Sequence, residues 1–147
     1  MVIIKVIILV IFFFYFKWRG KMKSKKSKAT DISMSVKKKV FERDKGRCVV
    51  CGNCYNVMPN AHYIPRSKGG LGIEENVVTL CTELTKNKCH RKYDFGTKEE
   101  REKIKSIIKK YLSNKYENWN EDELVYKKGE IKWNLQEKLK EKGKKKR

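Results

Sequence analysis

The sequence predicts a small α+β protein in which short helices and basic tails flank a compact centre. Apolar residues recur at helical spacing on both sides of residues 47–96, whereas those residues carry few helical periodicities and many turn signals. The same centre holds all five cysteines and both histidines. A chain of 147 residues is long enough for one domain with a modest core. We therefore expect one folded centre that carries the chemistry.

A short helix is expected before the centre, over residues 33–44. Ile32, Val36 and Val40 follow one another at intervals of four, which places them on one face of a helix. Gly46 then favours the end of that helix. Residues 22–32, which precede it, are rich in lysine and are expected to form a polar basic arm.

Helices are also expected after the centre, in a basic extension over residues 97–147. Thr97 and Glu100 have the spacing of a capping box, which predicts a helix start. The apolar face of this helix would consist of Ile104, Ile107, Ile108, Tyr111 and Leu112. A second short helix is expected from Asn120, and a final amphipathic helix from Ile131.

Residues 1–21 differ from the rest of the chain. Residues 2–16 are apolar except for Lys5, but a spanning helix needs about 20 apolar residues, and no small-residue cleavage site follows. Two interpretations remain open. The segment is either a short membrane anchor that leaves the domain on the cytoplasmic side, or upstream sequence before a natural start at Met22. We favour the second, and with it a cytoplasmic protein.

The net charge of +20 points to a polyanionic partner. Residues 17–28 hold seven basic and no acidic side chains, and residues 138–147 hold seven basic and one acidic. These two runs therefore carry +13 of the net charge, and we expect them to be solvated tails that attract phosphate without sequence preference.

The cysteines predict a metal site. Their odd number and the tight Cys48-x-x-Cys51 pair argue against a secreted disulfide framework and favour a reducing compartment. Two thiolates at this spacing can reach one tetrahedral Zn²⁺. Cys81 and Cys89 can supply the other two ligands, and Cys54 competes for a place in the set. We expect structural zinc at this site.

Both histidines lie close to the cysteines in the sequence. His62 follows Ala61 in the centre, and His90 follows Cys89 directly. If Cys89 opens a short helix, His90 and Asp94 share one face and can hold one divalent cation. An ordinary pair on a helix surface without metal is the alternative.

Four stretches together resemble the HNH endonucleases, and in particular small phage-type members. They are Cys48-x-x-Cys51, the run from Ala61 to Gly70 (AHYIPRSKGG), the run from Ile73 to Cys81 (IEENVVTLC) and the run from Cys89 to Asp94 (CHRKYD). The resemblance covers residues 36–94, with His62, Asn76 and His90 in the places of the family's three named residues. It implies a ββα-metal (His-Me finger) nuclease module with structural zinc, over residues 33–96.

The resemblance also implies a role for each of these residues. His62 would activate water for attack on a DNA phosphate, and Asn76 would orient His62 and fix the loop between the strands. His90 and Asp94 would hold Mg²⁺ or another divalent cation, and Arg66 and Lys68 would contact phosphate. The zinc ligands would be Cys48, Cys51, Cys81 and Cys89. No small-molecule cofactor is expected, and the chain would act as a monomer or weak dimer.

Two positions depart from the family pattern. Many members have Asp or His where this chain has Ala61, so the cation would have fewer protein ligands. The pair Cys81 and Cys89 is separated by what reads as a five-residue insertion within residues 82–88, which leaves open whether Cys81 or Cys54 completes the zinc site. Besides the nuclease, two alternatives are therefore a zinc-braced DNA-binding module without cleavage and a membrane-tethered basic protein.

Overall fold

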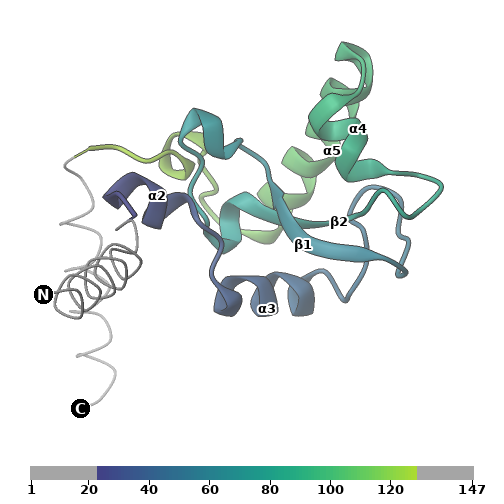
Figure 1. Cartoon of the computed structure of the whole chain (residues 1–147), viewed down its shortest axis with the longest axis horizontal. Helices are drawn as coiled ribbons and strands as arrows, with labels where there is room; N and C mark the ends of the chain where they lie inside the picture. Colours follow the sequence, from purple (N-terminus) through teal and green to yellow (C-terminus); the bar gives the residue numbers. More distant parts are fainter. Residues whose placement is uncertain (1–22, 129–147) are drawn as a thin grey trace, which may run out of the picture.

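A computed structural model of the chain describes residues 23–128 (Figure 1). Within these residues, two strands pair as a sheet and the helices lie around it. The elements are α2 (Lys25–Thr30), α3 (Met34–Arg43), β1 (Val57–His62), η1 (Arg66–Lys68), η2 (Glu74–Asn76), β2 (Val77–Cys81), α4 (Cys89–Phe95), α5 (Lys98–Lys115) and η3 (Glu121–Leu124).

The sheet is antiparallel, and its two ends carry different chemistry. At one end Val57 faces Cys81, and at the other His62 faces Val77; we call these the cysteine end and the histidine end. The register shifts between Pro59 and Ala61. Every residue of β2 is buried, because α3 and α4 both pack against it, from opposite sides of the sheet (Figure 1). The α+β class is therefore observed, with a strand, strand, helix order through α4.

The two helices predicted around the centre are confirmed. In α3 the Ser33 hydroxyl accepts a hydrogen bond from the Val36 amide at 3.3 Å, and Val40 is buried. In α5 the capping box of Thr97 and Glu100 is present in both directions. Such caps satisfy amides that the first turn of a helix leaves without partners.

The core brings the far helix α5 against the centre. Of its predicted apolar face, Ile104, Ile108 and Leu112 are buried. They share one cluster with residues of the sheet and with three cysteines; the buried members are Cys48, Ala61, Tyr63, Val78, Leu80, Cys81, Cys89, Ile104, Ile108, Leu112 and Leu124. Burial of large aliphatic side chains stabilises a fold by about 1.5–3 kcal/mol each, so α5 contributes substantially to this small core.

A buried ion pair ties α3 to the sheet. Arg43 pairs with Asp44 at 2.7 Å and also donates to the Val77 carbonyl at 2.8 Å. Asp44 accepts from the Thr79 amide at 2.7 Å and from the Tyr111 hydroxyl at 2.8 Å. Each charge is thus compensated, and these bonds hold three elements in register with one another.

The polar arm contains a helix that the sequence did not indicate. Helix α2 begins after Ser24, whose hydroxyl accepts from the Ser27 amide at 3.1 Å. The helix docks on the loop between the strands, where the Gly72 amide donates to the Ala29 carbonyl at 2.9 Å. The arm is therefore packed against the module rather than free of it.

Three further expectations concern the ends of the chain. The short helix expected from Asn120 is the 3-10 turn η3, with Asn120 as its N-cap. The helix expected from Ile131 and the apolar segment 1–21 lie outside the described residues. Between residues 23 and 128, no helix combines the length and the apolar character needed to cross a membrane.

Candidate metal centre and histidine site

Four cysteines gather at the cysteine end of the sheet. The sulfur atoms of Cys48, Cys51, Cys81 and Cys89 all lie within 4.8 Å of one another. Three of these side chains are buried, and Cys51 is exposed. Cys54 is exposed and lies outside the group, so Cys81 rather than Cys54 is the fourth member.

Turn geometry brings the four thiols together. The Cys48 amide donates to the Asn53 carbonyl and the Gly52 amide to the Cys48 carbonyl, both at 2.8 Å, which folds the first pair into a tight turn. On the other side, the Cys89 amide donates to the Cys81 sulfur at 3.2 Å. The five-residue insertion expected after Cys81 is a closed turn, in which the Thr85 hydroxyl donates to the Thr82 carbonyl at 2.9 Å.

The thiols of this group differ in how readily they ionise. Burial raises the pKa of the Cys48 and Cys89 thiols. The partial burial of Cys51 also favours its neutral form, but hydrogen bonds from the Asn53 amide, Asn87 and neighbouring thiols outweigh this and lower its pKa to about 7. Four thiols that lie close enough to share one ion fit a divalent metal such as zinc, which binds thiolates. The donor set and its geometry therefore fit structural zinc.

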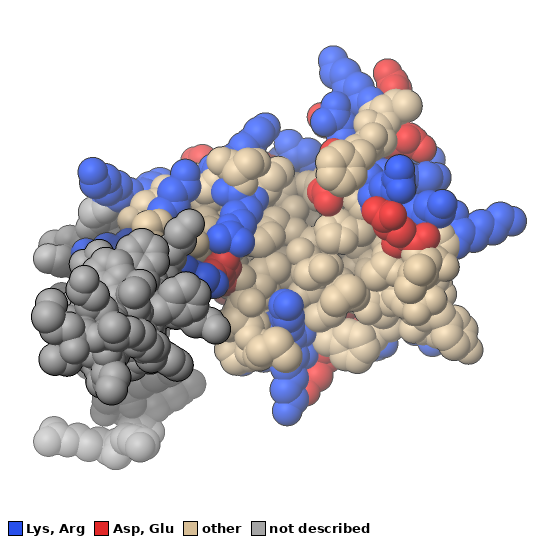
Figure 2. Space-filling model, viewed as in Figure 1, with Lys and Arg blue, Asp and Glu red and all other residues tan. Residues whose placement is uncertain are grey.

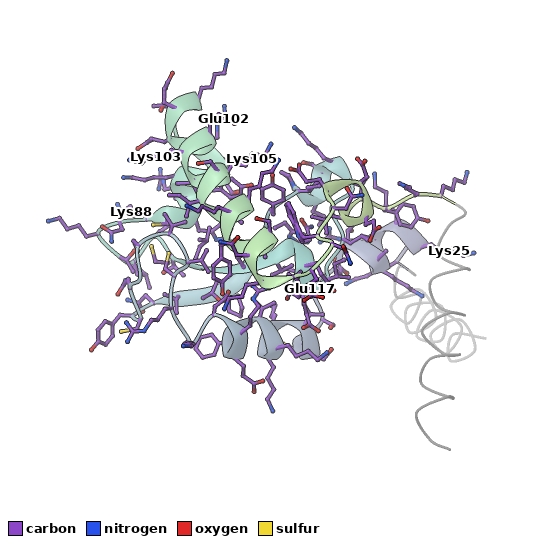
Figure 3. The ribbon with its side chains drawn as sticks, turned by 180° about the vertical axis from the view of Figure 1, so that it is seen from behind. Lys25, Lys88, Glu102, Lys103, Lys105 and Glu117 are labelled. Atoms are coloured by element: carbon purple, nitrogen blue, oxygen red, sulfur yellow. The ribbon has the colours of Figure 1, made fainter. Side chains whose placement is uncertain are left out.

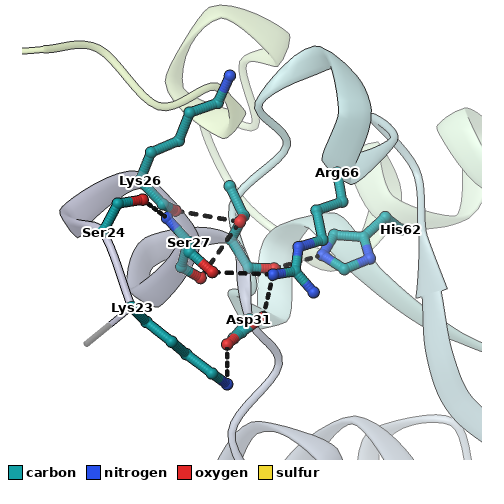
Figure 4. Close-up of polar contacts among 8 residues, drawn as sticks. Lys23, Ser24, Lys26, Ser27, Asp31, His62 and Arg66 are labelled. Atoms are coloured by element: carbon teal, nitrogen blue, oxygen red, sulfur yellow. Dashed lines mark hydrogen bonds and ion pairs between the residues drawn. The ribbon is translucent and has the colours of Figure 1, made fainter. Parts of the chain in front are cut away.

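His62 is the last residue of β1 and lies at the histidine end of the sheet. Its Nε2 is 3.1 Å from the main-chain oxygen of Thr30 in α2 (Figure 4). A carbonyl oxygen can only accept, so Nε2 carries the proton and Nδ1 is the basic nitrogen of the neutral ring. Burial lowers the pKa of His62 below its ordinary value, and the Thr30 carbonyl opposes this in part.

Asn76 fixes the loop between the strands. The residue is fully buried, and its amide group accepts from the Ile64 amide at 2.8 Å and donates to the carbonyls of Ile64 and Leu71, at 3.2 and 2.8 Å. The Tyr63 amide in turn donates to the Asn76 carbonyl at 2.7 Å. These bonds hold the residues directly after His62, whereas no bond joins the Asn76 side chain to His62 itself among the described residues.

His90 and Asp94 lie on α4, as the sequence predicted for a helix opened by Cys89. The His90 Nε2 is 3.4 Å from the Asp94 carboxylate, and both side chains are partly exposed. Tyr93 belongs to the same helix, and its hydroxyl donates to the Tyr63 carbonyl at 2.6 Å. This bond holds the helix beside the histidine end of the sheet. The Asp94 carboxylate is close enough to oppose, as a minor contribution, the lowering of the His62 pKa by burial.

The remaining predicted residues are placed as follows. Arg66 forms an ion pair with Asp31 at 2.6 Å and donates to the Ser27 hydroxyl at 3.0 Å, so its guanidinium is engaged with the arm (Figure 4). Lys68 is exposed on η1. Ala61 is only 1% exposed and belongs to the core, and as an alanine it offers no ligand atom.

Three residues contribute to the site although their sequence patterns assign them no role there. They are Thr30, which acts through its main-chain oxygen, Gly72, which receives the arm, and Tyr93, which ties α4 to the strand. A backbone acceptor leaves no trace in the residue type. Comparisons of the chain with protein-family models, with curated proteins and with solved structures gave no match.

Proposed function

We propose that this protein is a metal-dependent DNA endonuclease of the HNH type, with a ββα-metal module. Three features support the proposal. The chain order of β1, β2 and α4 is that of the module, the cysteine group can brace it with zinc, and the resemblance places chemistry at both histidines. Metal binding requires reduced cysteines, and thiols stay reduced in the cytosol. The proposal therefore includes a cytoplasmic location.

The observation that carries the proposal is the arrangement around His62. Its Nε2 is engaged by a carbonyl, and within residues 23–128 nothing bonds to Nδ1. A half-buried, neutral imidazole with one free nitrogen is the form that can take a proton from water near neutral pH. The helix that carries His90 and Asp94 lies beside it through the Tyr93 hydrogen bond.

The roles follow from these positions. His62 would accept a proton at Nδ1 from a water molecule, while Asn76 holds the loop that follows the base. His90 and Asp94 would hold the divalent cation, which when bound supplies positive charge to the phosphate that is attacked. Two protein ligands leave room for water and substrate oxygens, an arrangement that Mg²⁺ accepts. Zinc at the cysteines would be structural.

DNA is the proposed substrate because of the distribution of positive charge. Lysine and arginine side chains surround a broad uncharged area on one face of the molecule (Figure 2). From behind, Lys88, Lys103 and Lys105 lie at one end and Lys25 at the other (Figure 3). Contacts of lysine with phosphate give affinity without sequence preference, so we propose low specificity.

The test is cleavage of supercoiled plasmid with and without Mg²⁺ or Mn²⁺. Nicking should require the divalent ion and should fall by about 10²–10⁴-fold in His62→Ala, the usual contribution of a general base. Met58→Ala, a truncation on the same strand at an exposed position, is the matched control and should nick like the wild type. Zinc content should be unchanged in both variants.

A zinc-braced DNA-binding module without cleavage is the second candidate. One observation favours it: Ala61 is buried in the core, and in the described part of the chain no third His, Cys, Asp or Glu joins His90 and Asp94. This second function is supported if the zinc-loaded protein shifts DNA in a gel but leaves plasmid intact with every divalent ion tested.

A further inference from the structure

We infer that the N-terminal arm, residues 23–32, is a working part of the His62 site, in which the Thr30 carbonyl orients the imidazole. The inference rests on the proposed nuclease function, since it assigns a positioning group to the proposed base. It adds to the HNH module a segment that lies outside the residues covered by the resemblance.

First, the Thr30 carbonyl is available to His62 because it lies at the end of a helix. Helix α2 ends at Thr30, and the last carbonyls of a helix have no partner within that helix. The Thr30 hydroxyl folds back onto the Lys26 and Ser27 carbonyls, at 3.0 and 3.3 Å, so this side chain does not compete for His62. The main-chain oxygen of Thr30 is therefore left to accept from Nε2 of His62.

The second step is the effect of this bond on the imidazole. A hydrogen bond at one ring nitrogen fixes both the tautomer and the orientation of a histidine. With Nε2 as donor, the lone pair resides on Nδ1, the nitrogen that can act as base. Without the acceptor, the ring would rotate and exchange between tautomers, and the basic nitrogen would point correctly for only part of the time.

The third step is that the arm is held by several independent contacts. Arg66, in the segment after β1, forms an ion pair with Asp31 and a hydrogen bond to Ser27, and both contacts hold the arm (Figure 4). The Gly72 amide bonds to the Ala29 carbonyl, and Thr30 is buried. The ion pair with Asp31 also changes the role expected for Arg66. Its guanidinium fixes the arm and is not free to contact phosphate.

Gly72 provides the close approach that docking needs. A Cβ added at this position would overlap the Asp31 carbonyl group of the arm. The φ angle of Gly72 lies outside the left-handed region, so alanine could adopt the same backbone, and only the arm excludes it. Gly72→Ala is therefore a substitution that should displace the arm while leaving both strands and the cysteine group intact.

The experiment compares full-length wild type, Gly72→Ala and Asp31→Ala, with Met34→Ala as the control, because Met34 is an exposed, uncharged residue just after the arm. Zinc content should be equal in all four proteins. The kcat for plasmid nicking should fall by about 10–100-fold in Gly72→Ala, as for loss of an orienting partner, with KM little changed. Asp31→Ala should lose less, and Met34→Ala should match the wild type.

Two readouts separate positioning from a purely structural role. The ¹⁵N signals of the His62 ring should report the Nε2-protonated tautomer in the wild type and a mixture in Gly72→Ala. Displacing the arm exposes the ring, and because burial is the larger influence that lowers its pKa, the acidic limb of the rate profile should move to higher pH. The charged groups that act on the ring are Asp31, Arg66 and Asp94.

The outcomes distinguish the two proposals. If the wild type nicks and Gly72→Ala nicks equally fast, the arm is not a positioning element and the nuclease proposal stands. If the wild type never nicks, the nuclease proposal fails, and the ring signals still decide the arm: an Nδ1-protonated ring, or one unaffected by Gly72→Ala, overturns the inference. If Gly72→Ala does not fold, Asp31→Ala decides by the same readouts.

Discussion

The two ends of the sheet are built by different means. At the cysteine end, four thiols converge within 4.8 Å, and three of them are buried in the core. At the histidine end, His62 is held through a main-chain oxygen of a separate helix, and the loop after it is held by the amide of Asn76. Side chains of one type define the first end, whereas backbone groups from distant segments define the second.

This difference suggests that the cysteine end contributes stability, whereas the histidine end carries the proposed reaction. A closed set of four thiolates leaves no position for a substrate, which is the mark of a structural metal. The His62 ring keeps one nitrogen free, and the His90 and Asp94 pair stays partly exposed, so the other end remains accessible. Helix α4 joins the two ends, because Cys89 opens it and Asp94 lies five residues further on. Zinc bound at the cysteine group would therefore order the helix that carries the proposed cation ligands.

The largest effect is expected at the cysteine end. Cys48→Ser removes one ligand of the group, and since structural zinc supplies about 10–16 kcal/mol in small zinc domains, the variant should lose its metal and unfold. Zinc content by mass spectrometry and the circular dichroism spectrum are the measurements. Cys54→Ser is the matched control, because Cys54 lies outside the group, and it should keep one zinc per chain.

An equal loss of zinc in both variants would show that Cys54 is a ligand and that the cysteine end is wrongly assigned. Retention of zinc by folded Cys48→Ser would show that three thiols suffice.

A smaller effect is expected at the histidine end. Asn76→Ala leaves two carbonyls and one amide of a buried loop without partners, which should cost about 2–4 kcal/mol of unfolding free energy. Urea unfolding of the zinc-loaded protein is the measurement, and Asn114→Ala, at an exposed position in α5, should show no loss. The two ends are separable if Asn76→Ala still binds one zinc per chain. Release of zinc by this variant would contradict that separation.

The same contrast explains how much the sequence could predict. The caps and apolar faces of α3 and α5 depend on side chains at fixed spacing, and these helices lie where the pattern predicted them. The four cysteines are a spacing signal too, although only geometry could choose Cys81 over Cys54. Local patterns of residue type were therefore sufficient wherever the structure depends on local contacts.

The docking of the arm is a feature that local patterns of residue type did not predict. Residues 22–32 read as a solvated basic segment, because lysines dominate their composition. Its docking depends on the Thr30 carbonyl, the backbone beside Gly72 and one ion pair to Arg66, which bring together segments more than thirty residues apart. Main-chain acceptors have no residue signature, and the roles of His62, His90 and Asp94 in catalysis stay predictions.

The smallest effect concerns the bond that joins the two ends. Tyr93→Phe removes only the hydroxyl that donates to the Tyr63 carbonyl, so the core packing is kept and about 1 kcal/mol of unfolding free energy should be lost. Tyr55→Phe, at an exposed tyrosine, is the control and should leave stability unchanged. Both variants should bind zinc fully, but Tyr93→Phe should also nick plasmid more slowly, because α4 then loses its hydrogen bond to Tyr63, the residue that follows His62. Slower nicking with unchanged stability would mean that the hydroxyl acts on the reaction directly. Unchanged nicking would mean that the other contacts of α4 hold it in place without this bond.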